Sequence, residues 1–313
     1  MRNNFWLKLK TPILVLAPIA GFTNLVFREI CQDYGADVVY SEMASATALY
    51  YNQKEKNKTL ELLKKSKKEK NYVVQLFGGD EKHFPLATKI VSEKIKPAGI
   101  DINCGCPVSK VIKQSAGVDL MNDKKRARKI IKAVIDNTDL PVSIKIRKEA
   151  YGTKAVEFLK YLADLDISAI IVHGRSLKQG FTGEIDYSVI KEINKIFEGK
   201  VIANGNIYNL EIANKTLKET QADGLALARG ALNRPWLFEE IKKEKPINLN
   251  KKQLFSLIIK HAKLAEKEYG ENTVVALRKH LCYYMQNFPQ ASTYRQKLVH
   301  ASNLSDLKEI LKI

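Results

Sequence analysis

Cysteine is scarce in this chain, and long hydrophobic runs are absent from it. Four cysteines occur among 313 residues, too few and too scattered for a disulfide framework in a chain of this length. No uninterrupted apolar run approaches the ~20 residues that a membrane-spanning helix needs. The first ten residues are partly basic but hold no apolar segment typical of a signal peptide. We therefore expect a cytoplasmic protein that meets no membrane and keeps its cysteines reduced.

Acidic residues are also few relative to basic ones. The chain has 34 Asp and Glu against 52 Lys and Arg, which gives a formal net charge of +18 at pH 7. Such an excess attracts polyanions, and nucleic acid is the commonest large polyanion in the cytoplasm. A lysine-rich proteome, in which lysine simply covers solvated helix faces, would give the same excess. The charge indicates a nucleic-acid partner without establishing one.

A glycine-rich turn after the first strand, typical of doubly wound dinucleotide-binding sheets, is missing. Instead, eight apolar runs rich in Val and Ile alternate with longer amphipathic stretches. They span residues 12–18, 36–41, 72–77, 99–103, 141–146, 168–173, 200–204 and 223–228. Near-continuous apolar strands are expected where both faces of a parallel sheet are buried. Eight βα units in ~240 residues predict an α/β fold, a (β/α)8 TIM barrel, with the doubly wound sheet as the alternative.

Strand signals are also missing after residue 236. Residues 242–246 are typical of a linker, and apolar residues then recur at helical spacing. The helical stripes comprise Leu254, Leu257, Ile258, His261 and Leu264, ending near Gly270; Leu277, Leu281, Tyr284, Met285 and Phe288; and Leu304, Leu307, Ile310 and Leu311. We expect the barrel domain to cover residues 1–243, followed by a small C-terminal helical domain of three or four helices over residues 247–313.

Polar side chains end several of the predicted strands. Asn103 and Cys106 follow the fourth strand, in Asp-Ile-Asn-Cys-Gly-Cys-Pro. Lys145 closes the fifth strand, and His173 and Arg175 close the sixth. A TIM barrel builds its active site at the carboxyl ends of its strands. These residues therefore predict an enzyme.

Cys106 is the candidate acid or nucleophile. A thiol is mostly protonated near neutrality, which suits proton donation better than nucleophilic attack. The alternative is a small buried apolar residue, which is how we interpret Cys104. No second cysteine pair or histidine cluster has the spacing of a metal site, so we expect no metal. Lys145 could stabilise a developing anion such as a reduced flavin ring, or simply cap its strand in solvent.

Strands seven and eight end in patterns typical of phosphate binding. Asn204-Gly205-Asn206 follows the seventh strand, and Ala228-Arg229-Gly230 follows the eighth. In TIM barrels the loops after these two strands commonly hold a phosphate against backbone N–H groups. The two patterns together predict a cofactor that carries a phosphate.

Further motifs occur in a fixed order along nearly the whole chain. They are Ala17-Pro18-Ile19-Ala20-Gly21-Phe22-Thr23 with Phe27-Arg28, Ser41-Glu42-Met43, Val74-Gln75-Leu76, Lys110-Val111, Lys145-Ile146-Arg147, Phe181-x-Gly183, Asp223-Gly224 and Arg278-Lys279-His280. Together with the strand ends above, they resemble the tRNA-dihydrouridine synthases, FMN enzymes that reduce uridine in tRNA, and most of all the bacterial B-type members. Three positions depart from the family pattern: Ile19 replaces Met, Asn206 replaces Asp, and Ala228 replaces Gly.

The resemblance implies a tightly bound FMN, NADPH as reductant and tRNA as substrate. NADPH would reduce the FMN, N5 of the reduced flavin would pass a hydride to C6 of uracil, and Cys106 would protonate C5. The product would be 5,6-dihydrouridine, and NAD(P)+ would be the acceptor in the reverse sense. The residues that would hold FMN are Pro18, Ile19, Ala20, Gln75, Asn103, Lys145, His173, Asn204, Gly205, Asn206, Ala228 and Arg229. Those that would bind substrate are Asn103, Arg175, Arg278 and Lys279.

Other functions remain open at this stage. A small-molecule flavin oxidoreductase, like the dihydroorotate dehydrogenases, would share the barrel but has no use for a basic C-terminal domain. A non-catalytic RNA-binding protein would have no use for Cys106, Lys145 and His173. An aldolase could use Lys145 as an imine, but no neighbouring residue supports that chemistry. We expect a monomer whose helical domain binds RNA through basic side chains, although this domain could also be a solvated cap. The basic candidates are Lys251, Lys252, Arg278, Lys279, Arg295 and Lys297.

Overall fold

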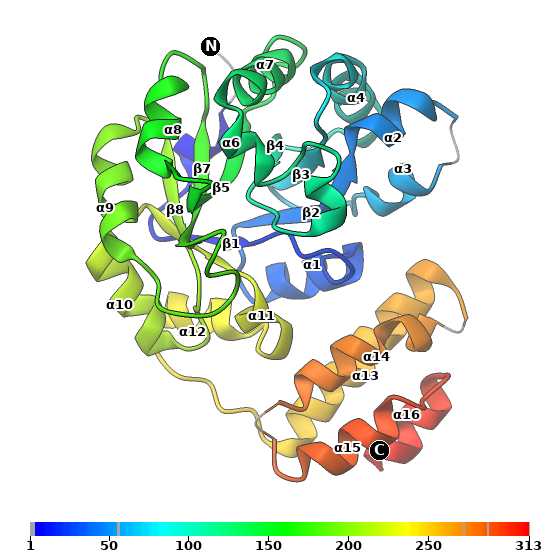
Figure 1. Cartoon of the computed structure of the whole chain (residues 1–313). Coiled ribbons are helices and arrows are strands. Elements are labelled where there is room, and N and C mark those ends of the chain that lie inside the picture. The colour runs from blue at the N-terminus through cyan, green and yellow to red at the C-terminus, as the bar shows by residue number, and fades with distance from the viewer. Residues whose placement is uncertain (1–3, 55–56, 272, 287, 313) are drawn as a thin grey trace.

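A closed barrel of eight parallel strands forms the centre of the part of the chain that the structure describes (Figure 1). The computed structural model describes residues 4–54, 57–271, 273–286 and 288–312. Hydrogen bonds join the strands in the order β4–β3–β2–β1–β9–β8–β7–β5, and β4 also pairs with β5. That last pairing closes the ring, so the predicted TIM barrel is confirmed and the doubly wound alternative is wrong.

The barrel strands are buried along most of their length, as the apolar runs predict. They are β1 (Ile13–Leu16), β2 (Val38–Ser45), β3 (Tyr72–Phe77), β4 (Gly99–Cys104), β5 (Val142–Ala150), β7 (Ala169–Ser176), β8 (Lys200–Asn204) and β9 (Gly224–Leu227). A two-residue strand, β6 (Thr153–Lys154), pairs antiparallel with the end of β5. All eight predicted strands are present, and β6 is an addition.

Helices surround the barrel and connect its strands. They are α1 (Leu25–Asp33), α2 (Ala46–Tyr51), α3 (Lys58–Leu62), α4 (Phe84–Ile90), α5 (Ser109–Ile112), α6 (Asp119–Asn122), α7 (Lys124–Ile135), α8 (Ala155–Tyr161), α9 (Tyr187–Ile196), α10 (Leu210–Thr220), α11 (Arg229–Asn233) and α12 (Leu237–Lys243). Single turns cover Phe5–Lys8, Glu81–His83 and Val91–Ile95. No helix within the described ranges has the length and apolar character needed to cross a membrane.

The predicted C-terminal helices are also present. They are α13 (Lys251–Tyr269), α14 (Thr273–Tyr284), α15 (Ala291–Leu298) and α16 (Leu304–Leu311). The first begins at a capping box, in which Asn250 and Gln253 satisfy each other's backbone N–H groups. It ends at Gly270, whose φ of 86° suits a residue without a Cβ atom.

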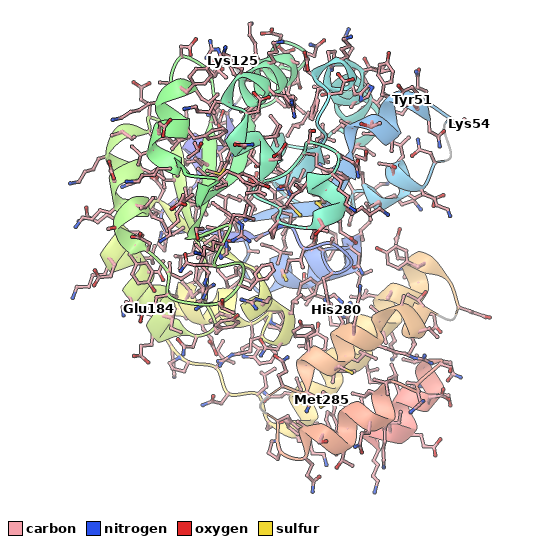
Figure 2. The ribbon with its side chains drawn as sticks, in the orientation of Figure 1. Tyr51, Lys54, Lys125, Glu184, His280 and Met285 are labelled. Carbon is pink, nitrogen blue, oxygen red and sulfur yellow. The ribbon has the colours of Figure 1, made fainter. Side chains whose placement is uncertain are left out.

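A second hydrophobic cluster, separate from the barrel core, holds the C-terminal helices together and joins them to the barrel. Leu25, Val26 and Ile30 of α1 belong to this cluster, whereas the large barrel core lies between the strands and the outer helices. Figure 2 shows His280 on the side of α14 that faces the barrel. The C-terminal helices therefore pack closely against α1 at the edge of the barrel.

Candidate active site

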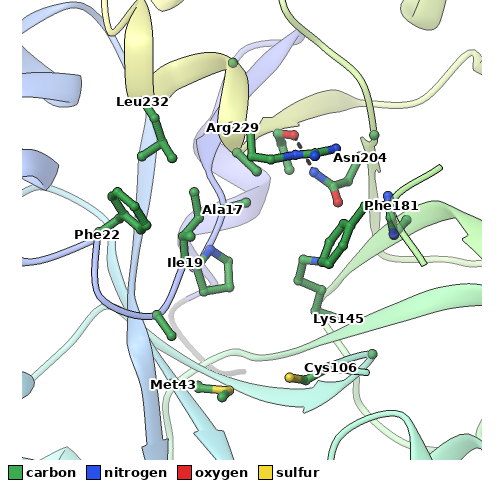
Figure 3. Close-up of a pocket in the computed structure, with 18 of the residues that line it drawn as sticks. Ala17, Ile19, Phe22, Met43, Cys106, Lys145, Phe181, Asn204, Arg229 and Leu232 are labelled. Carbon is green, nitrogen blue, oxygen red and sulfur yellow. Dashed lines mark hydrogen bonds between the residues drawn. The ribbon is translucent and has the colours of Figure 1, made fainter. Parts of the chain in front are cut away.

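A cavity of about 370 Å³ lies at the strand ends (Figure 3). It opens at the carboxyl ends of the barrel strands, where residues in or just after β1, β4, β5, β7, β8 and β9 contribute to its wall. Cys106 and all of the residues predicted to hold FMN line it. These residues are Pro18, Ile19, Ala20, Gln75, Asn103, Lys145, His173, Asn204, Gly205, Asn206, Ala228 and Arg229.

Hydrogen bonds to its backbone groups fix the loop that carries Cys106. The side-chain oxygen of Asn103 accepts hydrogen bonds from the N–H groups of Gly105 and Cys106, at 3.1 and 2.9 Å. The N–H of Val118 donates to the carbonyl of Cys106 at 3.1 Å. Gly117, with φ of 64°, has no room for a Cβ atom against that carbonyl. Cys106 therefore stays at the cavity wall, partly exposed, while Cys104 is buried in the barrel core as expected.

A buried chain of hydrogen bonds orients the amides beneath the cavity. Tyr40 and Ser143 are joined at 3.0 Å, and Ser143 donates to Asp101 at 2.7 Å. The Gln75 amide donates to the other oxygen of Asp101 at 2.7 Å and accepts from the Asn103 amide at 2.9 Å. Burial raises the pKa of Asp101 to about 6, although the bonds from Ser143 and Gln75 oppose the shift. These hydrogen bonds fix the orientation of the Gln75 and Asn103 side-chain amides at the cavity.

Cationic side chains surround the cavity, and no carboxylate lines it among the residues that the structure describes. Burial, together with the neighbouring Arg147, lowers the pKa of Lys145 to about 8. Burial also lowers the pKa of His173 to about 2, and the charges of Lys145, Arg147, Arg175 and Arg229 add to that effect. His173 is therefore neutral at pH 7 and Lys145 is mostly charged. A cavity with this uncompensated positive charge suits an anionic ligand.

Arg147 joins the loops after β4 and β7 beside the cavity and was not assigned a role from the sequence. Its guanidinium donates to the carbonyls of Gly105, Ser176 and Gly180, at 2.9, 3.1 and 2.9 Å. It also lies 5.6 Å from the ring centre of Phe181. The sequence did contain a pattern that indicates this position. Residues two apart in a strand face the same side, and Arg147 follows Lys145 by two positions.

The loops after β8 and β9 meet backbone to backbone at the end of the cavity where a phosphate was expected. The Asn204 amide donates to the carbonyl of Ala226 at 2.7 Å. Gly205 has φ of 133°, and a Cβ atom there would clash with Ile185. A Cβ atom on Gly230, at the start of α11, would clash with the carbonyl of Ile207. Residues 204–206 and 228–230 line the cavity here beside the Arg229 guanidinium, and backbone N–H groups with a guanidinium are donors that fit a phosphate group.

Three predicted substrate-binding residues lie outside the cavity lining. Arg175 donates through Nε to the carbonyl of Gly183 at 3.0 Å and is almost fully buried. Arg278 donates to the carbonyl of Ala301 at 2.8 Å. Lys279 lies with its Nζ 4.5 Å from the ring centre of Phe22, next to the cavity. These contacts are within the chain, and contact with substrate stays a prediction for all three.

Several cavity residues carried no assignment from the sequence. They include Phe22, Met43, Tyr208, Leu232 and Tyr283. Tyr283 belongs to α14, so a helix of the C-terminal domain reaches the cavity. No local pattern distinguishes such an aromatic residue from one that packs in the helical core. Within the described ranges, no group of three or more His, Cys, Asp and Glu side chains is placed to hold a metal ion.

The sequence is similar to those of known tRNA-dihydrouridine synthases. The chain is 33% identical over 304 residues to a probable tRNA-dihydrouridine synthase of Helicobacter pylori (strain J99), covering 96% of this chain and 90% of the relative. It is also 33% identical over 291 residues to tRNA-dihydrouridine synthase B of Pseudomonas syringae pv. tomato, covering 90% and 85%.

Solved structures share the barrel at much lower identity. TcOYE with pHBA has a TM-score of 0.56 at 11% identity, covering 75% of this chain and 90% of that one. The old yellow enzyme homologue from Zymomonas mobilis has a TM-score of 0.52 at 13% identity, with the same coverage. A profile of the dihydrouridine synthase (Dus) family matches residues 15–313. Because this match and those of the relatives span nearly the whole sequence, the chain belongs to the dihydrouridine synthase family of oxidoreductase enzymes.

Proposed function

We propose that this protein is an FMN-dependent tRNA-dihydrouridine synthase, which uses NADPH to reduce the C5–C6 double bond of uridine in tRNA. The observation that carries the proposal is one cavity at the strand ends that is lined by Cys106 together with Lys145, Arg147 and Arg229. Bound FMN, once reduced, would supply the hydride that C6 of the uracil accepts. The proposal includes a monomeric protein in the cytoplasm.

The residues around the cavity fit FMN in chemistry and in position. The backbone around Gly205 and Ala228, with Arg229, would hold the phosphate. Gln75 and Asn103, oriented by the hydrogen bonds that pass through Asp101, would hydrogen-bond the polar ring. Lys145 would stabilise negative charge on the reduced ring. The ring would be lined by Pro18, Ile19 and Ala20, and neutral His173 would donate or accept one hydrogen bond without adding charge.

Cys106 would act as the general acid. After hydride arrives at C6, the uracil carries an enolate whose C5 takes a proton, and the thiol is the donor on the cavity wall. The two backbone bonds to Asn103 keep the Cys106 loop from moving away from that position. Asn103, which lines the cavity, would touch both cofactor and base.

The tRNA substrate would have to present its uracil as a base turned out of the stack. Unstacking costs a few kcal/mol and is smallest for a base in a mobile loop. Contacts with phosphate would then supply the affinity. We propose the C-terminal helices as the platform, through the basic residues of α13, α14 and α15. The candidates remain Lys251, Lys252, Arg278, Lys279, Arg295 and Lys297.

An anaerobic reoxidation experiment tests the proposal. The purified protein is reduced with NADPH, mixed with tRNA that lacks dihydrouridine, and followed at the absorption band of the flavin. We expect rapid return of the oxidised spectrum with tRNA and none with free uridine. A flavin that stays reduced with tRNA would point instead to a small-molecule substrate. A preparation without any flavin band would contradict the cofactor assignment.

A further inference from the structure

Helix α14 forms part of the cavity wall. Tyr283, near its C-terminal end, lines the cavity together with Phe22 of the β1–α1 loop and Leu232 of α11. Figure 3 shows Phe22 and Leu232 on the opposite side of the cavity from Lys145. This side presents apolar and aromatic side chains, whereas the other side carries the amides and the cations.

Three side chains of α14 contact the ring of Phe22. Lys279 places its Nζ 4.5 Å from the ring centre of Phe22, within the range of a cation–π interaction. His280 and Tyr283 meet the same ring edge to face, with centroids 4.9 and 5.4 Å away. The ring of Phe22 is therefore enclosed by one face of α14.

The loop that carries Phe22 also carries the predicted ring contacts of the cofactor. Its turn is closed by Thr23, whose hydroxyl accepts from the N–H of Ile19 at 3.1 Å. The N–H of Gly21 donates to the carboxylate of Glu42. Gly21 has φ of 75°, and a Cβ atom there would meet the Nζ of Lys279.

Glu42 and Lys279 together fix this loop from two elements. Burial raises the pKa of Glu42, while the Gly21 amide and the Lys279 charge oppose the rise. The loop residues 19–23 thus have one anchor on β2 and another on α14. Any shift of α14 away from the barrel would release the second anchor.

The chemistry of the cavity decides which part of a flavin would meet this apolar side. The pyrimidine end of the ring system is polar and needs partners such as Gln75 and Lys145. The dimethylbenzene end has no hydrogen-bonding group, so it fits the apolar side that Phe22, Leu232 and Tyr283 form. Uracil, which is polar along most of its edge, fits the apolar side poorly.

We propose that the C-terminal helical domain is part of the cofactor site, with Tyr283 contacting the dimethylbenzene edge of the flavin and Lys279 positioning the β1–α1 loop through Phe22. This inference rests on the proposed flavin function. It assigns Lys279 a role within the chain, in addition to the contact with tRNA predicted from the sequence. The affinity for flavin then depends on the docking of α14 against the barrel.

The test measures flavin release from the full-length holoprotein. Stepwise dilution frees FMN, and the recovery of its fluorescence gives the dissociation constant. Tyr283→Leu keeps apolar bulk but loses the aromatic face, and we expect the dissociation constant to rise about five- to tenfold. Lys279→Met, which removes the cation next to Phe22, should raise it about threefold. Tyr283→Phe should stay within about twofold of the unmodified protein.

Matched controls separate this role from general loosening of the helices. Tyr294→Leu alters an aromatic residue of α15 that packs on Phe255 and Phe288 away from the cavity. Lys263→Met removes an exposed lysine of α13. Neither should change flavin release. Equal release from folded Tyr283→Leu and the unmodified protein would overturn the inference and leave the proposed function intact. If Tyr283→Leu does not fold, unchanged release from Lys279→Met overturns it.

An unmodified protein that binds no FMN would contradict the proposed function, and this inference with it. Loss of flavin from Tyr294→Leu as readily as from Tyr283→Leu would also overturn the inference, because the effect would then belong to the stability of the helices. The near-ultraviolet circular dichroism of each variant reports whether the helical domain remains packed.

Discussion

At the scale of single residues, Cys106 is the proposed proton donor of the reaction. Replacing it with Ala removes the acid but leaves the loop bonds to Asn103, which involve backbone N–H groups. Positioned acid catalysis contributes about 10²–10⁴-fold in rate. We expect Cys106→Ala to slow tRNA-dependent reoxidation of the flavin by that factor while flavin content stays unchanged.

Cys282 supplies the matched control for that substitution. It is a partly buried thiol on α14 that does not line the cavity. Cys282→Ala should reoxidise at the rate of the unmodified protein. A Cys106→Ala protein that kept full activity would refute the acid role, and one that lost its flavin would assign Cys106 to cofactor binding instead.

We expect Lys145 to make the proposed flavin affinity depend on pH. Its pKa is lowered to about 8 mainly by burial, so the charge that would attract an anion is lost as pH rises through this value. We expect flavin release from the holoprotein to increase between pH 7 and pH 9. Lys145→Met should bind about tenfold more weakly at pH 7 and show little further change with pH. Lys148→Met, which removes a lysine paired with Asp186 at 3.2 Å, should retain the pH dependence of the unmodified protein.

Unfolding cannot imitate that result, because the stability of the ligand-free protein responds to Lys145 with the opposite sign. The pKa of Lys145 is lower in the folded protein than its ordinary value of 10.5. Between the two values the unfolded chain binds more protons, so the free energy of unfolding rises with pH. A pH profile in which Lys145→Met matched the unmodified protein would remove Lys145 from the site.

At the scale of elements, the loop after β8 depends on Gly205. Its φ of 133° disfavours any L-residue with a side chain, and a Cβ atom would press on Ile185 and on the ring of His173. We expect Gly205→Ala to lower flavin affinity at least tenfold, measured by the same dilution assay. Gly152→Ala is the control, because Gly152 has φ of 82° with open space around it.

The two glycine substitutions separate backbone strain from the shape of the cavity. Both should lower the melting temperature, since each places Ala at positive φ. Only Gly205→Ala should also release flavin. If Gly152→Ala released flavin equally, strain alone would explain the effect and the packing of Gly205 against His173 would not matter.

The sequence was sufficient to predict most of the barrel, because its strands are buried on both faces and read as apolar runs. Where strands extend beyond the barrel, prediction failed. β5 continues to Ala150, past the predicted end at residue 146, because its polar end pairs with β6 in a hairpin. Arg147 is part of that polar end. Pairing between segments outside the core leaves no hydrophobic pattern in the sequence.

The same limit applies to the site. Strand-end residues such as Lys145 could be predicted because the fold itself brings strand ends together. Tyr283 could not, because it reaches the cavity only through the packing of α14 on α1. Nor does a pattern tell whether an arginine faces substrate or a loop carbonyl. Arg175 and Arg278 both donate to carbonyls of their own chain.

At the scale of the whole molecule, the junction between barrel and helical domain contains two buried histidines. His261 of α13 bonds the hydroxyl of Tyr284 at 2.9 Å, and its ring centre lies 5.1 Å from that of His280 on α14. The ring of Phe27 of α1 lies 4.5 Å from that of His280, at an angle of 47° between the ring planes. Burial lowers the pKa of His261 to about 3 and that of His280 well below 6.5. Both are neutral in the folded protein.

These histidines should make the junction sensitive to acid. Below pH 6.5 the unfolded chain protonates them while the folded chain does not, so the free energy of unfolding falls with decreasing pH. Each such histidine contributes up to about 1.4 kcal/mol per pH unit until its folded pKa is reached. The stabilisation is fully present above pH 6.5 and decreases between pH 6.5 and pH 3, and the net charge of +18 adds repulsion in the same direction.

Replacing His280 with Phe removes one of these titrations while preserving an aromatic ring beside Phe27. We expect the melting temperature of His280→Phe, measured from pH 7.5 to pH 4.5, to fall less steeply than that of the unmodified protein, whatever its value at pH 7.5. His261 and the buried His173 would contribute to the slope that remains, together with the repulsion from the net charge. His300→Gln, a change at an exposed histidine, should leave the slope unaltered. Parallel curves for His280→Phe and the unmodified protein would mean that His280 is not buried in its neutral form, and that α14 contacts the barrel less closely than the cofactor-site proposal requires.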